Sequence, residues 1–307
     1  MSAESQFDAL KELDVDSAAS EFRVFRHSST DKLFSSHFVP VSPDLLKEVK
    51  GAAAYFQSQV SEHSPYGILD EPNESGALTL DLSETNFSHL ETALNVPAQE
   101  CMLTKVMRLN SASGYVLKVA LPQDGYAYFI KKVHASWSTK AERNFISALF
   151  NEQELALASD KVFYISKSFD FVAIGGHAFI QKKRSFESLL KFKGHYEAEF
   201  SALTNEAEFT GLFSDFSIIA DYVGTNSIQL RRMAVIKERQ HYKDASFMTK
   251  VQELSAAHPQ WGISFDDDGK IGISSNNVRA VVQCLLDLRL KSEFSGRYYD
   301  AQFATAL

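Results

Sequence analysis

Residues 114–133 have the sequence GYVLKVALPQDGYAYFIKKV. Two runs rich in β-branched and aromatic residues stand on either side of Pro122-Gln123-Asp124-Gly125, a segment with the composition of a turn. This pattern predicts two antiparallel strands joined by a short loop. Further along the chain, apolar runs stand on both sides of Gly175-Gly176, which predicts a second pair of strands. Together the two pairs favour a mainly antiparallel sheet.

Segments with the apolar spacing of helices precede and follow these strands. Ser42 and Pro43 are residue types that begin helices, and residues 186–248 have mostly helical spacing. Residues 264–274 contain Asp268-Gly269 and predict a further hairpin. A final helix carries an apolar stripe that lies either in the core or against a second copy of the chain, made of Val278, Val281, Val282, Leu285 and Leu286. The predicted fold class is α+β, with a mainly antiparallel sheet and flanking helices.

Composition excludes several classes of protein. Hydrophobic residues make up 45% of the 307 residues and charged residues 23%, which excludes a wholly disordered chain. Cys101 and Cys284 form neither a disulfide framework nor a zinc motif, and we expect two buried thiols in a reducing compartment. The acidic N-terminus is unlike a signal peptide, and no apolar run approaches the ~18 residues of a membrane span. These features predict a cytoplasmic location.

The formal charge of −8 is unevenly distributed along the chain. Residues 1–100 hold 6 bases and 17 acids, residues 101–200 hold 14 and 9, and residues 201–307 hold 11 and 13. The pattern changes to strands after Pro97, so we predict a small acidic N-terminal α/β region over residues 1–100, which serves assembly, and a larger domain over residues 101–307. The basic middle segment is able to meet a polyanion, because phosphate binding depends on local potential. The alternative is a set of solvated lysines on unrelated faces.

Basic residues gather at predicted strand ends and in the helical region after residue 230. The candidate DNA-binding residues are Lys131, Lys132, Lys182, Lys183, Arg184, Lys191, Lys193, Arg231, Arg232 and Arg239. Adjacent strand residues face opposite sides, so a shared patch would have to be assembled from several elements. The sequence contains no recognition-helix, zinc-finger or RNP motif, so any DNA contact would be with phosphate and largely independent of base sequence.

Catalytic motifs are absent from the sequence. It contains no phosphate-binding glycine loop, no nucleophile elbow and no paired histidines at metal-binding spacing, so we predict no catalytic set, no metal site and no cofactor. One arrangement resembles the metal-dependent nucleases with a PD-(D/E)xK motif, since we expect Asp170 on one strand and Gln181-Lys182-Lys183 on its hairpin partner. Gln181 supplies no charge where an acid is expected. The structural alternative is that Asp170 forms a cap or a local pair.

Residues 163–190, with the sequence FYISKSFDFVAIGGHAFIQKKRSFESLL, resemble the domain of the KwaB-like family, the component of the Kiwa antiphage defence system that does not span the membrane. The resemblance continues through LRRMAVIKE (230–238), the 264–274 hairpin, and the final helix ending LLDLRLKSEFSGRYYD (285–300). It covers roughly residues 100–307 and also the general layout of the first hundred residues. Its motifs are apolar and structural, so specificity comes from their order and spacing.

The resemblance implies a DNA-binding effector of phage defence. It also implies self-association and a KwaA-like transmembrane partner, which would hold the chain at the periphery of the inner membrane. The residues leave three hypotheses open: a protein that binds duplex DNA without cleaving it, a metal-dependent nuclease using Asp170, Gln181 and Lys183, and a scaffold whose basic segment meets acidic protein or anionic lipid.

Overall fold

The computed structural model describes residues 2–27, 33–103, 111–133, 148–151, 154–157 and 165–301. The chain forms two compact units. Unit 1 comprises residues 1–66 and 71–190, and unit 2 comprises residues 67–70 and 191–307. This division differs from the predicted boundary near residue 100, because strands from the first hundred residues pair in the same sheet as strands that follow them.

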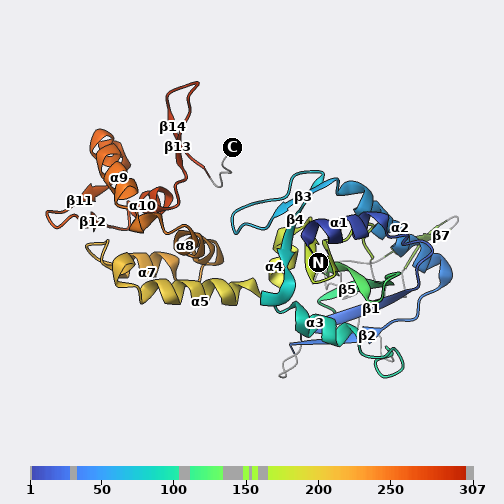
Figure 1. The fold of residues 1–307 in the computed structure, drawn as a ribbon. Coiled ribbons are helices and arrows are strands. Elements are labelled where there is room, and N and C mark those ends of the chain that lie inside the picture. The colour runs from blue at the N-terminus through green and yellow to red at the C-terminus, as the bar shows by residue number, and fades with distance from the viewer. Residues whose placement is uncertain are drawn as a thin grey trace. The chain divides into compact units, whose positions relative to one another are not determined.

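Unit 1 is built on one sheet of eight strands in the order β2-β1-β5-β6-β9-β10-β4-β3. Figure 1 labels β1 to β5 of this sheet. Its strands are β1 (Ser20–His27), β2 (Phe34–Phe38), β3 (Glu62–Pro65), β4 (Gly76–Asp81), β5 (Gly114–Ala120), β6 (Tyr126–Lys132), β9 (Phe171–Ile174) and β10 (His177–Ile180). Every neighbouring pair is antiparallel except β3 with β4. The α+β fold class with a mainly antiparallel sheet is therefore confirmed.

The two predicted hairpins form as expected. Leu117 of β5 is opposite Phe129 of β6, and the turn between the strands places Asp124 and Gly125 at φ 64° and 93°. The turn from β9 to β10 places Gly175 and Gly176 at positive φ of 54° and 83°, a region that glycine occupies without strain. A further two-stranded sheet pairs β7 (Ala148–Asn151) with β8 (Glu154–Leu157).

Helices cover both faces of the sheet in unit 1. α1 (Ala3–Glu12) and α2 (Pro43–Gln59) bury apolar side chains in one core with alternate residues of β5 and β6. Ser42 caps α2, as predicted, by accepting a hydrogen bond of 3.3 Å from the Leu45 N–H. On the other face, Phe87 of α3 (Phe87–Leu94) packs on Tyr128, and α4 (Lys183–Leu189) packs on β9. The short η1 (Leu82–Glu84) precedes α3.

Unit 2 is mainly helical and has its own core. Its elements are α5 (Phe192–Thr204), α6 (Ala207–Thr210), α7 (Ser217–Val223), α8 (Ser227–Arg239), η4 (His241–Lys243), α9 (Ala245–Ala257), η5 (Pro259–Trp261), β11 (Ser264–Phe265), β12 (Ile271–Gly272), α10 (Val278–Leu285), β13 (Arg289–Lys291) and β14 (Tyr298–Asp300). The predicted 264–274 hairpin is β11 with β12, and the apolar stripe of α10 lies in the core of this unit.

The final helix is shorter than predicted. α10 ends at Leu285, Asp287 takes a φ of 54°, and residues 289–300 form the β13–β14 hairpin. Both cysteines are buried thiols, as expected. Within the described ranges, none of the helices combines the length and the apolar character needed to span a bilayer.

The start of β5 leaves no room for a side chain. A Cβ on Gly114 would lie 2.5 Å from the Lys131 carbonyl oxygen and 2.5 Å from the Phe25 ring. We expect Gly114→Ala to lower the free energy of unfolding of unit 1 by about 1–3 kcal/mol, measured by urea denaturation, because backbone and ring would have to shift. Gly51→Ala is the control, since a Cβ there meets nothing within 4 Å on α2 and should stabilise by up to about 1 kcal/mol. Equal changes in the free energy of unfolding for the two variants would contradict the close packing at Gly114.

Candidate nucleic-acid interface

Three neighbouring strands of unit 1 meet at one end of the sheet, where β6 and β10 finish and β9 begins. Ile130 of β6 is opposite Phe171 of β9, which is opposite Ile180 of β10. Because β9 runs antiparallel to both neighbours, the carboxyl ends of β6 and β10 flank the start of β9. Five predicted DNA-binding residues lie at or directly after these two strand ends, and we call them the basic sheet end: Lys131, Lys132, Lys182, Lys183 and Arg184.

A buried carboxylate holds this end of the sheet together. The Asp170 side chain is 4% exposed, and its Oδ1 lies 2.8 Å from Nζ of Lys131. Its Oδ2 accepts a hydrogen bond of 2.9 Å from the backbone N–H of Lys132. Its backbone carbonyl accepts hydrogen bonds from the backbone N–H groups of Gln181 and Lys182, at 3.0 and 2.9 Å. Asp170 therefore connects the end of β6 to the end of β10.

Adjacent lysines separate as strand geometry predicts. Lys131 is 12% exposed and points to the buried carboxylate, whereas Lys132 donates a hydrogen bond of 2.6 Å to Ser188 Oγ on α4. Lys183 is 2% exposed, and its ammonium lies 4.9 Å from the centroid of the Tyr66 ring. The Lys183 side chain is thus packed inside unit 1 and Lys131 is neutralised, so neither is available to a phosphate in this structure.

The exposed cations at the basic sheet end are Lys182 and Arg184, and Lys132 is partly exposed. Within the described part of the chain, neither the Lys182 nor the Arg184 side chain has a hydrogen-bond or ionic partner. The segments 130–132, 168–171 and 180–190 together hold five bases and two acids, Asp170 and Glu187, so this end carries a local excess of positive charge. Lys191, which caps α5, is likewise exposed and without a side-chain partner among the described residues.

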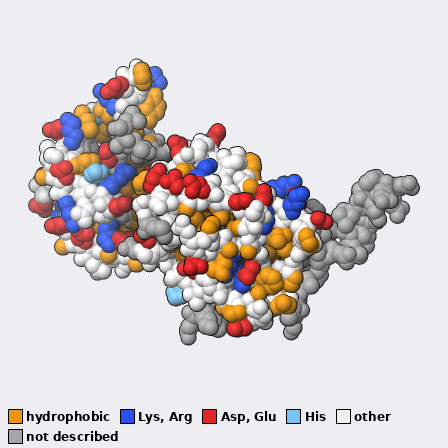
Figure 2. Space-filling view, turned by 45° about the vertical axis from the view of Figure 1, so that its right-hand side comes forward, with side chains coloured by type: hydrophobic (Ala, Val, Ile, Leu, Met, Phe, Trp, Pro, Cys, Tyr) orange, Lys and Arg blue, Asp and Glu red, His pale blue; other side chains and the backbone are white. Residues whose placement is uncertain are grey.

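The other predicted residues belong to unit 2, where most have local contacts. Lys193 pairs with Glu197 at 3.5 Å, Arg231 lies over the Tyr196 ring at 5.8 Å, Arg232 donates to Gln229 Oε1 at 3.3 Å, and Arg239 donates to the Leu286 carbonyl at 2.7 Å. Figure 2 shows basic and acidic side chains interspersed on the visible face. The ten residues therefore fall into two sets of five, one in each unit.

Contacts between distant parts of the sequence complete the basic sheet end. The Tyr66 hydroxyl donates a hydrogen bond of 2.7 Å to Glu187 Oε1, and Nε2 of His27 lies 2.8 Å from the Leu189 carbonyl oxygen. Sequence analysis did not single out Tyr66, Glu187 or His27. No local pattern identifies them, because each contact joins positions more than a hundred residues apart.

The arrangement around Asp170 corresponds to the local pair considered in the sequence analysis. Both carboxylate oxygens are engaged, and Gln181 meets Asp170 through its backbone. Among the residues that the structure describes, no three His, Cys, Asp or Glu side chains are grouped closely enough to hold a metal ion.

The model of the family described as Kiwa protein KwaB-like matches residues 109–295. The match covers more than half of the chain, so this chain belongs to the KwaB-like family of the Kiwa antiphage defence system, and the resemblance inferred from residues 163–190 is confirmed. Family membership implies a role in antiphage defence. No curated protein and no solved structure matches the chain.

Removal of the Asp170 carboxylate would leave the largely buried Lys131 ammonium without its ionic partner, with only a hydrogen bond of 3.4 Å to Ser168 Oγ, and would remove the acceptor of the Lys132 N–H. We expect Asp170→Ala to lower the free energy of unfolding of unit 1 by about 3 kcal/mol in urea denaturation followed by circular dichroism. The matched control is Asp8→Ala, because Asp8 is exposed on α1, and it should change stability by less than about 1 kcal/mol. An Asp170 variant as stable as this control would show that the contacts of the Asp170 carboxylate with Lys131 and Lys132 do not stabilise the sheet.

Proposed function

We propose that this KwaB-like chain binds duplex DNA through phosphate contacts at the basic sheet end and acts by occupying the DNA. The observation that carries the proposal is the exposure of Lys182 and Arg184, two cations without side-chain partners among the described residues, at a strand end where bases outnumber acids. An unpaired cation gives up no ion pair when it meets a phosphate, so it contributes more to polyanion binding than a neutralised one.

Binding of this kind would be largely independent of DNA sequence. Lysine and arginine side chains that contact phosphates position a duplex without distinguishing its bases. The hydrogen bond from Lys132 to Ser188 leaves the Lys132 side chain partly exposed beside α4, where it adds a third contact to those of Lys182 and Arg184. Three phosphate contacts predict a slope of about −3 for the logarithm of affinity against the logarithm of salt concentration.

The proposal also includes partners. Membership of the KwaB-like family supports a place within the Kiwa system. We propose that a KwaA-like partner spans the inner membrane and holds this chain at its periphery. We also propose that the chain self-associates. In this proposal the acidic residues 1–100, with 17 acids against 6 bases, would face protein partners, because their charge repels DNA.

The double substitution Lys182→Ala and Arg184→Ala tests the interface. Fluorescence anisotropy with a short labelled duplex, measured across a salt series, should show weaker binding and a slope reduced in magnitude by about 1.8. The control is Lys47→Ala with Lys167→Ala, which removes the same charge from two exposed positions of unit 1. An unchanged slope in the first double variant, or an affinity that does not depend on salt, would favour the scaffold hypothesis.

Occupancy without cleavage has its own test. We expect supercoiled plasmid to remain intact when incubated with the pure protein and Mg²⁺ or Mn²⁺, because the Asp170 carboxylate is engaged by Lys131 and the Lys132 N–H. Gel electrophoresis separates nicked from supercoiled plasmid. Nicking that disappears in Asp170→Asn, with the folded state checked by circular dichroism, would instead support the nuclease hypothesis.

A further inference from the structure

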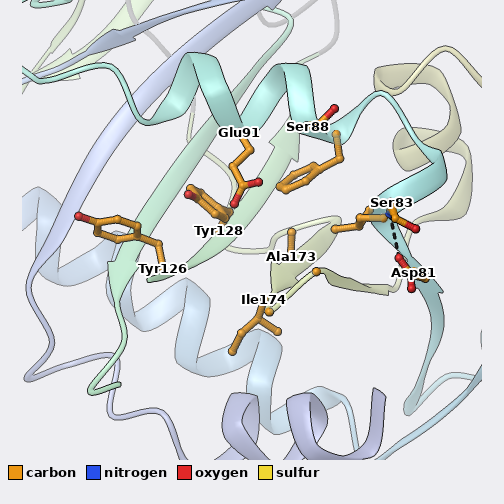
Figure 3. A pocket seen from close by; sticks show the side chains of 12 residues that line it. Asp81, Ser83, Ser88, Glu91, Tyr126, Tyr128, Ala173 and Ile174 are labelled. Atoms are coloured by element: carbon orange, nitrogen blue, oxygen red, sulfur yellow. Dashed lines mark hydrogen bonds between the residues drawn. The ribbon is translucent and has the colours of Figure 1, made fainter. Parts of the chain in front are cut away.

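The sheet of unit 1 has a cavity of about 190 Å³ at the end opposite the basic sheet end (Figure 3). There Tyr126 begins β6, Asp81 ends β4, and Gly175-Gly176 joins β9 to β10. α3 forms the other wall. The cavity is thus built from four segments of the chain and lies within one compact unit.

The lining of this cavity is mainly apolar, and its charged side chains are both acidic. Asp81 and Glu91 supply carboxylates, and none of the described residues that line the cavity is Lys, Arg or His. Figure 3 shows Glu91 extending from α3 toward Tyr128, with Asp81 on the other side beside Ser83. The Ser83 N–H donates a hydrogen bond of 2.8 Å to Oδ1 of Asp81. Such a lining favours a ligand that donates hydrogen bonds and carries positive charge.

An exposed aromatic ring stands at the edge of the cavity. Tyr126 is 41% exposed, and the ammonium of Lys118 lies 3.8 Å from the centroid of its ring. Lys118 is only 5% exposed and donates to the Leu94 carbonyl at 3.4 Å, so it occupies the inner side of the ring. The Tyr126 ring therefore already packs against one cation, and its accessible surface is left for another.

The charges around the cavity remain negative in sum. Hydrogen bonds from Ser83 hold the pKa of Asp81 below its usual range, and burial raises the pKa of the Tyr128 phenol, so at neutral pH the first is ionised and the second is not. Burial lowers the pKa of Lys118, whereas the carboxylate of Glu21 and, less strongly, that of Glu91 oppose this shift, and Arg23 adds to it. Around the cavity the acids are Asp81, Glu91 and Glu21 and the bases are Lys118 and Arg23, so three acids stand against two bases.

We propose that this cavity binds a guanidinium group, carried either by an arginine side chain or by a small free guanidine compound. A guanidinium is planar, stacks on aromatic rings and donates paired hydrogen bonds to a carboxylate, which matches the Tyr126 ring and the Glu91 carboxylate. Asp81 lies on the far side of the cavity and adds negative potential. The volume lies below the ~300–1,000 Å³ of pockets for drug-sized ligands, so it suits a single side chain. The carboxylates repel phosphate, so this site is independent of the proposed DNA interface.

Saturation-transfer NMR titrations of the full chain test the proposal with three probes. These are agmatine, the peptide N-acetyl-Gly-Arg-Gly-amide, and the same peptide with neutral citrulline in place of arginine. We expect saturation transfer from the protein to at least one guanidinium probe and none to the citrulline peptide, because citrulline has the shape of arginine without its charge. Binding of the arginine peptide identifies a side chain of a protein as the natural source, whereas binding of agmatine alone identifies a free compound.

Variants of the lining locate the binding. Glu91→Gln and Tyr126→Leu should each lower the affinity for the probe that binds by about 3- to 10-fold, as expected for loss of one ionic or one cation–π contact. Glu48→Gln removes the same charge from an exposed position on α2 and should leave the affinity unchanged. Equal binding of the citrulline peptide, no binding of either guanidinium probe, or full affinity in folded Glu91→Gln would overturn the proposal.

Discussion

The carboxylate of Asp170 is the constraint on which the organisation of unit 1 depends. A buried ionised group has to be matched by partners, and Asp170 finds them in the Lys131 ammonium and the Lys132 N–H. The same residue accepts backbone hydrogen bonds from the start of the segment that leads into α4. The side chain of Asp170 thus connects the end of β6 to the start of β9, and its backbone carbonyl fixes how the chain leaves β10 for α4. The positions of Lys182 and Arg184 follow from that departure.

The sheet of unit 1 carries opposite charge at its two ends. Bases follow the carboxyl ends of β6 and β10, whereas Asp81 and Glu91 lie at the end where β4 finishes and β6 begins. Because these groups are separated by the length of the strands, exposed cations at one end are not neutralised by carboxylates at the other. A single sheet can therefore present a surface for polyanions and a cavity for cations, although the whole chain has a net charge of −8.

Local patterns in the sequence were sufficient for the hairpins and insufficient for the sites. The turns at Asp124-Gly125 and Gly175-Gly176 were predictable because glycine and its neighbours determine a turn within four residues. The burial of Lys183 was not predictable. Lys183 begins α4, and its ammonium lies over the ring of Tyr66, a residue more than a hundred positions earlier in the chain. The cavity likewise needs four segments. The β13–β14 hairpin was missed because Asp287, a non-glycine residue, takes the positive φ that follows the helix.

The family match and the compact units do not coincide, and this difference bears on the first hundred residues. The match begins at residue 109, yet β5 pairs with β1 and β10 pairs with β4, which both precede it. The core beneath these strands is closed by α1 and α2. The acidic N-terminal residues are therefore an integral part of the sheet that positions the basic sheet end. If partners bind these residues as proposed, they act on the same sheet that carries the proposed DNA interface.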